Sequence, residues 1–272
     1  MIGDTVIQAA LISGIGLFAG LIGGLTGLGG SVVMLPGLAI LIGFHDPSRA
    51  EQHTYQAAAM AVNFLVAVPA TWRHSKAGAI RPMLLVRLLP PAVCMMVVGV
   101  LLSNAFKGES LVKVLGATIA VMVIVGEISH HVFKKRSDGL DDDVRIRRAT
   151  PAIVGTGVAT GFLAGLLGIG GGVITVVSLQ TLGRIPIKQA IAGSTATMCL
   201  MAPVGASLKM MTLHEHGQHV IDAVRLVGLL GPAAIVGSLI GASLVHRLPL
   251  AVIRPGVAVI LLLAAAKLGG VI

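Results

Sequence analysis

The chain carries few charged residues: 11% of its 272 residues are charged, whereas 55% are hydrophobic. A soluble protein has about 25% charged residues, so this composition excludes a soluble enzyme, a nucleic-acid-binding protein and a secreted disulfide scaffold. Aromatic residues account for only 3%, which argues against a membrane β-barrel with aromatic girdles. The two cysteines, Cys94 and Cys199, both lie deep in apolar runs, and we expect no disulfide. The sequence therefore predicts an integral membrane protein.

Carboxylates are also missing from the middle of the apolar runs. Glu51 and Glu127 lie only near the ends of such runs, so the sequence does not indicate a carboxylate proton relay at the centre of the membrane. It has no phosphate-binding loop, no Ser/His/Asp set and no intramembrane group of metal ligands. We therefore expect no enzymatic activity, no cofactor and no resident metal.

Ten apolar segments predict an all-α, polytopic fold. Eight are long enough to cross about 30 Å of hydrocarbon, whereas segments 31–43 and 172–182 would form helices only about 20 Å and about 16 Å long. Each of these short segments follows directly on a glycine run. The ten segments are residues 5–25, 31–43, 54–72, 83–105, 111–129, 151–169, 172–182, 189–212, 223–245 and 250–271.

The 36 glycines reveal an internal repeat. Residues 20–31 align with residues 161–172, and five glycines of the first run then fall on five of the second: Gly20, Gly24, Gly27, Gly29 and Gly30 on Gly161, Gly165, Gly168, Gly170 and Gly171. The sequence thus divides into an N-terminal transmembrane repeat (1–129), a polar linker (130–150) and a C-terminal transmembrane repeat (151–272). Each half has five segments, or three crossings if the short segments are re-entrant. Because both numbers are odd, we expect two inverted repeats with broken helices.

The basic residues fix the predicted orientation. The 130–150 linker contains six Lys or Arg residues, which indicates the cytoplasmic side. Alternation then places the loops 73–82, 183–188 and 246–254, which are also basic, on the same side, and both termini outside. We expect a multi-pass protein of the cell inner (plasma) membrane, in contact with the lipid bilayer.

The glycine runs are the first candidate site. Free N–H groups at the start of a short helix bind anions, helped by the helix dipole, and inverted halves would bring two such starts together near the membrane midplane. The candidate residues are Gly29, Gly30 and Ser31 in the first half and Gly170, Gly171 and Gly172 in the second. The alternative is that these glycines only permit tight helix packing.

Hydrogen-bonding side chains that open the next long segment of each half form the second candidate set. They are Thr54, Tyr55 and Gln56 in the first half and Ser194 and Thr195 in the second. Such groups inside a membrane often mark a substrate pathway. Alternatively, Thr54 and Ser194 only cap helices. Asn63 lies further along the first of these segments, and we expect its amide to form a hydrogen bond between helices.

Two further features have a simpler explanation. Arg87 and Lys209 lie inside apolar segments but close to their ends, so we expect both side chains to reach the membrane surface. His214, His216 and His219 resemble a metal-binding tract, but a solvated outer loop is the favoured interpretation.

The paired glycine runs, in a polytopic chain of this length, resemble the TauE/SafE sulfite exporter family, also called the 4-toluene sulfonate uptake permease family. The resemblance is carried by 161–172, Pro186 and the run 190–194, and it covers essentially the whole chain. The first half departs from the family pattern at Ser31, where a third glycine is usual, and at His53. The resemblance implies transport of sulfur-containing anions such as sulfite, sulfonates or sulfoacetate.

Together these features predict a secondary transporter of a small anionic sulfur compound that works by alternating access. Two alternatives stay open: a divalent metal-ion exporter that uses the histidines at 214, 216 and 219, and a passive anion channel built on the same glycine turns.

Overall fold

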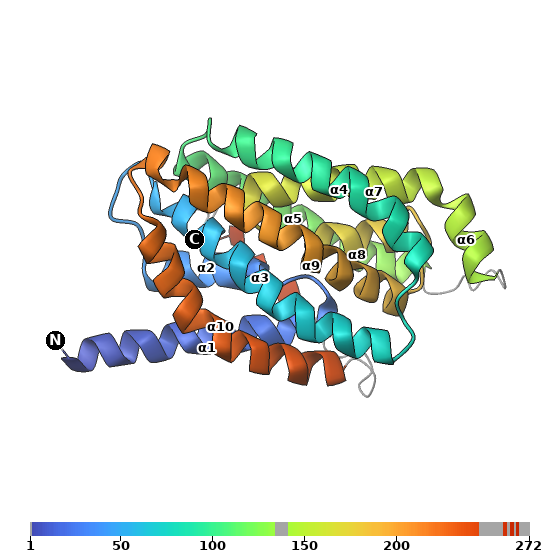
Figure 1. Cartoon of the computed structure of the whole chain (residues 1–272), viewed down its shortest axis with the longest axis horizontal. Coiled ribbons are helices and arrows are strands. Elements are labelled where there is room, and N and C mark those ends of the chain that lie inside the picture. The colour runs from blue at the N-terminus through green and yellow to red at the C-terminus, as the bar shows by residue number, and fades with distance from the viewer. Residues whose placement is uncertain (1, 134–140, 245–257, 260–261, 264, 267–272) are drawn as a thin grey trace.

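The computed structural model describes residues 2–133, 141–244, 258–259, 262–263 and 265–266. These residues form a bundle of helices without any strand, which confirms the all-α prediction (Figure 1). In chain order the elements are α1 (Ile2–Thr26), α2 (Ser31–Leu41), α3 (Glu51–Lys76), α4 (Pro82–Ser103), α5 (Gly108–Phe133), α6 (Asp142–Arg148), α7 (Thr150–Leu167), α8 (Gly172–Thr181), α9 (Ile187–Thr212), the 3-10 helix η1 (Leu213–His216) and α10 (Val220–Leu244).

Six helices of the described chain are apolar and long enough to cross a membrane: α1, α4, α5, α7, α9 (extended through η1) and α10. They correspond to six of the eight long segments predicted from the sequence. The predicted segment 250–271 lies mostly outside the described residues. The predicted segment 54–72 forms the middle of α3, which is 26 residues long but is not among the six apolar helices.

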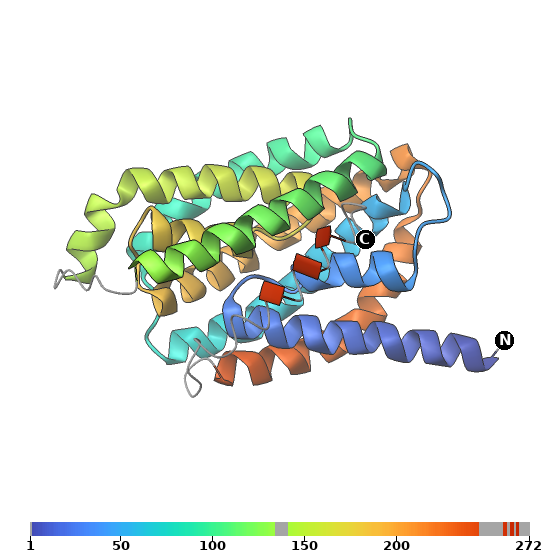
Figure 2. The same ribbon diagram turned by 180° about the vertical axis from the view of Figure 1, so that it is seen from behind.

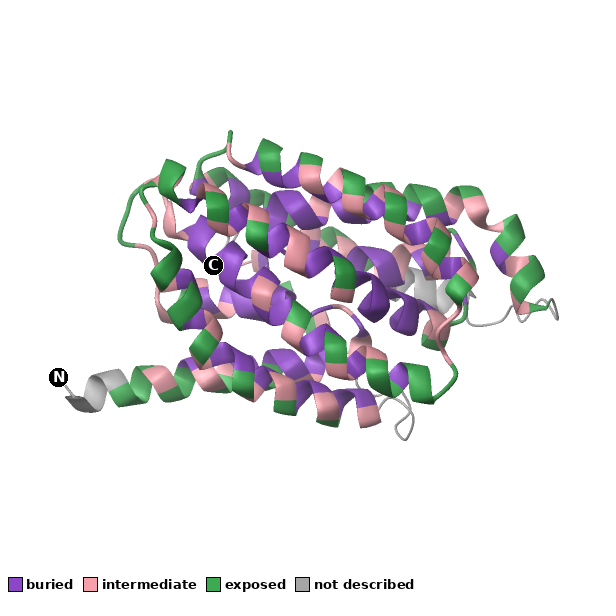
Figure 3. Ribbon diagram, in the orientation of Figure 1, coloured by how far each residue is buried: buried purple, intermediate pink, exposed green. Residues whose placement is uncertain are grey.

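Helix α3 is less apolar because it lies inside the bundle, where it packs against α9 and α10. Figure 3 shows the buried residues concentrated in such interior helices. Gln52, His53, Gln56 and Asn63 are each at most 1% exposed. These polar side chains lie in the half of α3 nearer its start, which is enclosed by protein, so they are free to bond with neighbouring helices. The second half exposes Phe64, Val68 and Trp72 on one face.

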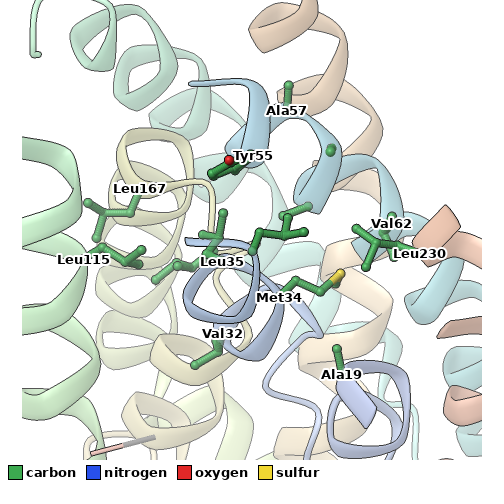
Figure 4. Packing of buried hydrophobic residues seen from close by; sticks show 14 of the residues in the cluster. Ala19, Val32, Met34, Leu35, Tyr55, Ala57, Val62, Leu115, Leu167 and Leu230 are labelled. Atoms are coloured by element: carbon green, nitrogen blue, oxygen red, sulfur yellow. The ribbon is translucent and has the colours of Figure 1, made fainter. Parts of the chain in front are cut away.

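The short helix α2 is also enclosed by protein. Figure 4 shows Val32, Met34 and Leu35 packed among side chains from other helices, and all three are at most 1% exposed. A helix of 11 residues is too short to cross the membrane. Its burial keeps its ends and the preceding turn away from lipid, where unsatisfied backbone groups would be costly.

The order of helices repeats, and contacts link one repeat to the other. Helices α1 to α4 and α7 to α10 each follow the order long, short, long, long. The most extensive pairings are α1 with α10 and α4 with α7, and Figures 1 and 2 show α1 and α10 lying side by side from both directions. Exchanging the two halves converts one pairing into the other. The inversion of the halves relative to the membrane stays a prediction.

Both pairings are built on glycine seams, by which we mean the glycines at four-residue spacing on α1 and α7. At each seam position an added Cβ would collide with a backbone carbonyl of the partner helix, so only glycine allows this approach. Gly16, Gly20 and Gly24 of α1 lie on the carbonyls of Leu230, Ala234 and Ser238, and Gly157, Gly161 and Gly165 of α7 lie on those of Leu88, Ala92 and Met96. For these glycines the packing interpretation holds.

The loop 73–82, the described part of the linker (141–150) and the start of α9 meet at one end of the bundle, and the basic loop 246–254 lies outside the described residues. The carboxylate of Asp142 accepts hydrogen bonds from Arg81 and from Gln189 Nε2, and Arg87 Nη1 donates to the Ile146 carbonyl at 2.9 Å. The linker was predicted only as a polar connection, and its residues 142–148 form the helix α6. Acidic residues in its first turn and arginines in its last turn suit the helix dipole.

The loops expected outside meet at the opposite end. Thr54 Oγ1 donates to Gln218 Oε1 at 3.0 Å, and the Glu109 N–H donates to the Ser48 carbonyl at 3.1 Å. We call this the outer end, following the predicted orientation.

Candidate functional site

The two glycine turns have matching backbone conformations. Gly27 and Gly29 have φ angles of 68° and 84°, and their repeat partners Gly168 and Gly170 have φ angles of 74° and 67°. Residues with a side chain rarely adopt this left-handed region. The aligned glycines are therefore required by the turns themselves as well as by the seams.

The turns meet in the interior of the bundle, and we call residues 27–31 and 168–172 together the glycine crossing. An added Cβ on Gly172 would collide with the Leu28 carbonyl, so the two turns are in direct contact. Ser194 Oγ donates to the Gly27 carbonyl at 2.8 Å, which joins α9 of the second half to the turn of the first.

Asn63 of α3 lies between the two turns. Its Oδ1 accepts the Ser31 N–H at 3.0 Å, and its Nδ2 donates to Ser31 Oγ at 2.9 Å. Its Nδ2 is also the nearest atom to an added Cβ on Gly170. These bonds confirm the prediction that Asn63 bonds between helices. That it does so at the glycine turns could be suspected only from its position as an uncharged amide in the middle of an apolar segment.

The remaining backbone donors of the crossing are not used by the described residues. No hydrogen bond from the N–H groups of 29–30 or 170–172 is formed within this part of the chain. All five residues are buried. Both sets of donors lie at the starts of short helices, α2 and α8, where the helix dipoles favour negative charge.

The structure divides the predicted polar side chains into two groups. Ser194 belongs to the crossing, and Gln56 lies against it, since an added Cβ on Gly168 would meet the Gln56 side chain. Thr195 Oγ1 bonds within its own helix, to the Ala192 carbonyl at 3.1 Å. Tyr55 and Thr54 bond toward the outer end instead, to the Gly43 carbonyl at 2.7 Å and to Gln218.

Lys209 does not reach the membrane surface as expected. It is 1% exposed, and its Nζ donates to Gln56 Oε1 and to Ser103 Oγ, each at 2.6 Å. The expectation was wrong because α3 and α4 cover this face of α9, which its place near a segment end does not reveal. Among the described residues, no carboxylate forms an ion pair with Lys209.

A cavity of about 310 Å³ lies at the outer end of the bundle. His53 and His216 stack there with ring centroids 3.6 Å apart. The described residues contain no group of three or more His, Cys, Asp or Glu side chains able to hold a metal ion. The cavity is lined by Asp46, Ser48, Ala50, His53, Asn104, Ala105, Phe106, Lys107, Gly108, Glu215 and His216.

Comparison with known proteins gives a direct family match. The family described as "Sulfite exporter TauE/SafE" matches residues 12–268. The chain belongs to this family. Membership confirms the resemblance drawn from the glycine runs, and together with the six apolar helices it identifies a multi-pass membrane protein of a transporter family.

Relatives within the TauE/SafE family carry general names. A "Probable membrane transporter protein" of Haemophilus influenzae is 27% identical over 261 residues, which cover 92% of this chain and 94% of the relative. The "Probable membrane transporter protein MamO" of Magnetospirillum gryphiswaldense is 25% identical over 267 residues, covering 88% of this chain. The match spans only 41% of MamO. No solved structure matches the chain.

Proposed function

We propose that this protein is a secondary transporter of small sulfur-containing anions, of the sulfite, organosulfonate or sulfoacetate type, in the plasma membrane. The observation that carries this proposal is the glycine crossing, where the N–H groups at the starts of two short helices are buried and unused among the described residues. The name of the family supports a sulfur oxyanion as the substrate. The sequence places no carboxylate in the middle of the apolar segments, so the site has no charge that would oppose an anion.

The oxygens of a sulfite or sulfonate group would accept hydrogen bonds from the N–H groups of 29–30 and 170–172. Asn63 Oδ1 already accepts one donor of the crossing, the N–H of Ser31, and an amide oxygen resembles an anion oxygen as an acceptor. We infer that a bound anion competes with Asn63 for this donor. Ser194 would complete the site with its hydroxyl group.

Alternating access requires two bodies that move around a fixed site. The glycine seams hold α1 against α10 and α7 against α4, and each pair joins one half to the other. We infer that these pairs move as units, while α2, α3, α8 and α9 carry the crossing between them.

Uptake into proteoliposomes tests the proposal. Purified protein should transport sulfite or a sulfonate with a saturable rate, and unlabelled sulfur anions should compete. Saturation separates a transporter from a channel, because channel flux would grow with concentration without exchange of substrate. Absence of flux for sulfite, thiosulfate, taurine, sulfoacetate and aryl sulfonates would reject the proposed substrate class.

A further inference from the structure

The buried ammonium of Lys209 has no role in the crossing described above. An ammonium has three N–H donors, and Lys209 uses two, toward Gln56 and Ser103. Both partners are neutral, so its positive charge is buried without an opposite charge among the described residues. Burying an unpaired charge is strongly unfavourable, and a site that only joined helices would be served by a neutral side chain.

The surroundings of Lys209 contain further unused polar atoms. Gln56 is 0% exposed, and its Nε2 has no hydrogen-bond partner among the described residues. Gln52 is also 0% exposed, with neither side-chain polar atom paired. Because residues four apart lie on one face of a helix, Gln52 extends this polar face of α3 one turn toward the outer end.

The same cluster connects the outer cavity with the glycine crossing. Ser103 is adjacent in sequence to Asn104, which lines the cavity, and Thr212 of α9, three residues after Lys209, donates to Asn104 Oδ1 at 3.4 Å. On its other side, Gln56 lies against Gly168 of the crossing. Lys209 thus stands between the cavity and the crossing.

We propose that Lys209, Gln56 and Ser103 form an anion-binding station between the outer cavity and the glycine crossing. This inference rests on the proposed function and names the residues that attract the substrate. The station binds one anionic oxygen group through the third N–H of Lys209 and the Gln56 amide, and the anion supplies the charge that Lys209 lacks. Compact anions such as sulfite and the head group of a sulfonate fit this chemistry.

Two matched pairs of variants test the station. Lys209→Met removes the charge but keeps a chain of similar length, and Lys113→Met removes a lysine that is exposed and paired with Glu109. Ser103→Asp places a carboxylate beside Lys209, whereas Ser103→Asn has nearly the same size without the charge. Calorimetric titration of each purified protein with sulfite, sulfoacetate, phosphate and acetate gives the affinities, and melting temperature reports folding.

Lys209→Met and Ser103→Asp should bind sulfite or sulfoacetate at least about tenfold more weakly than the parent, because a charge-assisted bond is lost or neutralised. Lys113→Met should stay within about threefold of the parent. Ser103→Asn should bind sulfite or sulfoacetate more tightly than Ser103→Asp, because the two side chains have nearly the same size and only the aspartate neutralises Lys209. If Lys209→Met does not fold, the difference between Asp and Asn at position 103 decides the question.

The outcomes separate the station from the proposed function. If the parent binds sulfur anions and the folded Lys209→Met and Ser103→Asp variants bind them equally well, the station is wrong and the function stands. If the parent binds only phosphate or acetate, and these variants lose that binding, the station stands and the sulfur substrate is wrong. If the parent binds none of the four anions, both are overturned.

Discussion

The seam glycines and the turn glycines of the same repeat have different physical roles. Gly20 and Gly161 are helical and lie against the backbone of a partner helix, so a side chain there would separate two helices. Gly29 and Gly170 have positive φ angles and lie where a helix breaks. Both types coincide in the sequence alignment. A glycine repeat therefore identifies the two halves, but the structure is needed to assign each glycine to packing or to the site.

The two glycine turns differ at the aligned positions Gly30 and Gly171, and this difference allows packing and anion binding to be tested separately. Gly171 has a φ angle of 77°, whereas its partner Gly30 has a φ angle of −71°. An added Cβ on Gly30 would meet first the flexible end of Met34. A methyl group at Gly30 is thus compatible with the backbone, and it would lie against the end of Met34 and the Ala19 carbonyl of α1, beside the N–H group of residue 30 itself.

The largest expected effect concerns the orientation of the halves and is all or none. In a variant in which Cys94 and Cys199 are replaced by serine, a cysteine introduced at Ser75 should react only with a reagent on the cytoplasmic side. A cysteine at His219 should react only from outside. Both native residues are exposed, at opposite ends of the bundle. Reaction of both from the same side would contradict the inverted repeats, and the crossing would then lose its symmetry.

The next largest effect is on stability. Gly161→Ala should lower the free energy of unfolding by about 3 kcal/mol, because its Cβ collides with the Ala92 carbonyl and the two helices must separate. Gly155→Ala is the control, since it lies on the same helix with open space around it, and it should be neutral or slightly stabilising. Unfolding in mixed micelles measures both. Equal stability of the two variants would show that the seam does not hold α7 against α4.

Two substitutions of Asn63 separate stability from binding. Asn63→Leu should lower the free energy of unfolding by less than Gly161→Ala does. It leaves the Ser31 N–H buried without its acceptor, at a cost of about 1–3 kcal/mol. Asn63→Asp keeps an acceptor of the same shape but adds a buried negative charge at the crossing, so a folded variant should not bind sulfite, and its loss of stability should be at least as large as that of Asn63→Leu. If Asn63→Asp binds sulfite like the parent, the anion does not reach the crossing.

Gly30→Ala should separate folding from binding. We expect the melting temperature to stay close to that of the parent, because the φ angle suits alanine and Met34 is flexible. Affinity for sulfite should fall about tenfold, since the methyl group hinders close approach of an anion to the backbone. Gly14→Ala, on α1 with open space around it, is the control. A variant that loses stability but keeps affinity would assign Gly30 to packing.

The sequence predicted the fold class, the family and the short helices, because apolar length and glycine spacing are local properties of the chain. It also predicted that Asn63 bonds between helices, which its two bonds to Ser31 of α2 confirm. It missed the burial of Lys209, because that depends on which distant helices cover this side chain. Ser103 of α4 and Gln56 of α3 surround Lys209, and no local pattern links these three positions. The helix α6 was missed for the opposite reason: its polar composition indicated a linker, although the charges at its ends favour a helix.

The smallest expected effect compares two neighbouring hydroxyl groups on α9. Ser194 Oγ bonds across the crossing to the Gly27 carbonyl, whereas Thr195 Oγ1 bonds only to the Ala192 carbonyl of its own helix. Ser194→Ala should cost about 0.5–1.5 kcal/mol of stability and should weaken sulfite binding severalfold, because the first turn loses its tie to α9. Thr195→Ser keeps its hydroxyl and should change neither quantity.

Measuring unfolding and affinity on the same samples gives both quantities for this pair. If Ser194→Ala loses stability but keeps full affinity, the hydroxyl only holds the turn in place, and the anion is bound by backbone donors alone. If it loses affinity at unchanged stability, the hydroxyl bonds directly to the anion, because a bond to the Gly27 carbonyl that stabilised the fold would appear in the unfolding measurement. The comparison of Ser194 with Thr195 thus tells whether a side chain at the crossing stabilises the fold or binds the anion, as the glycine variants do for the backbone.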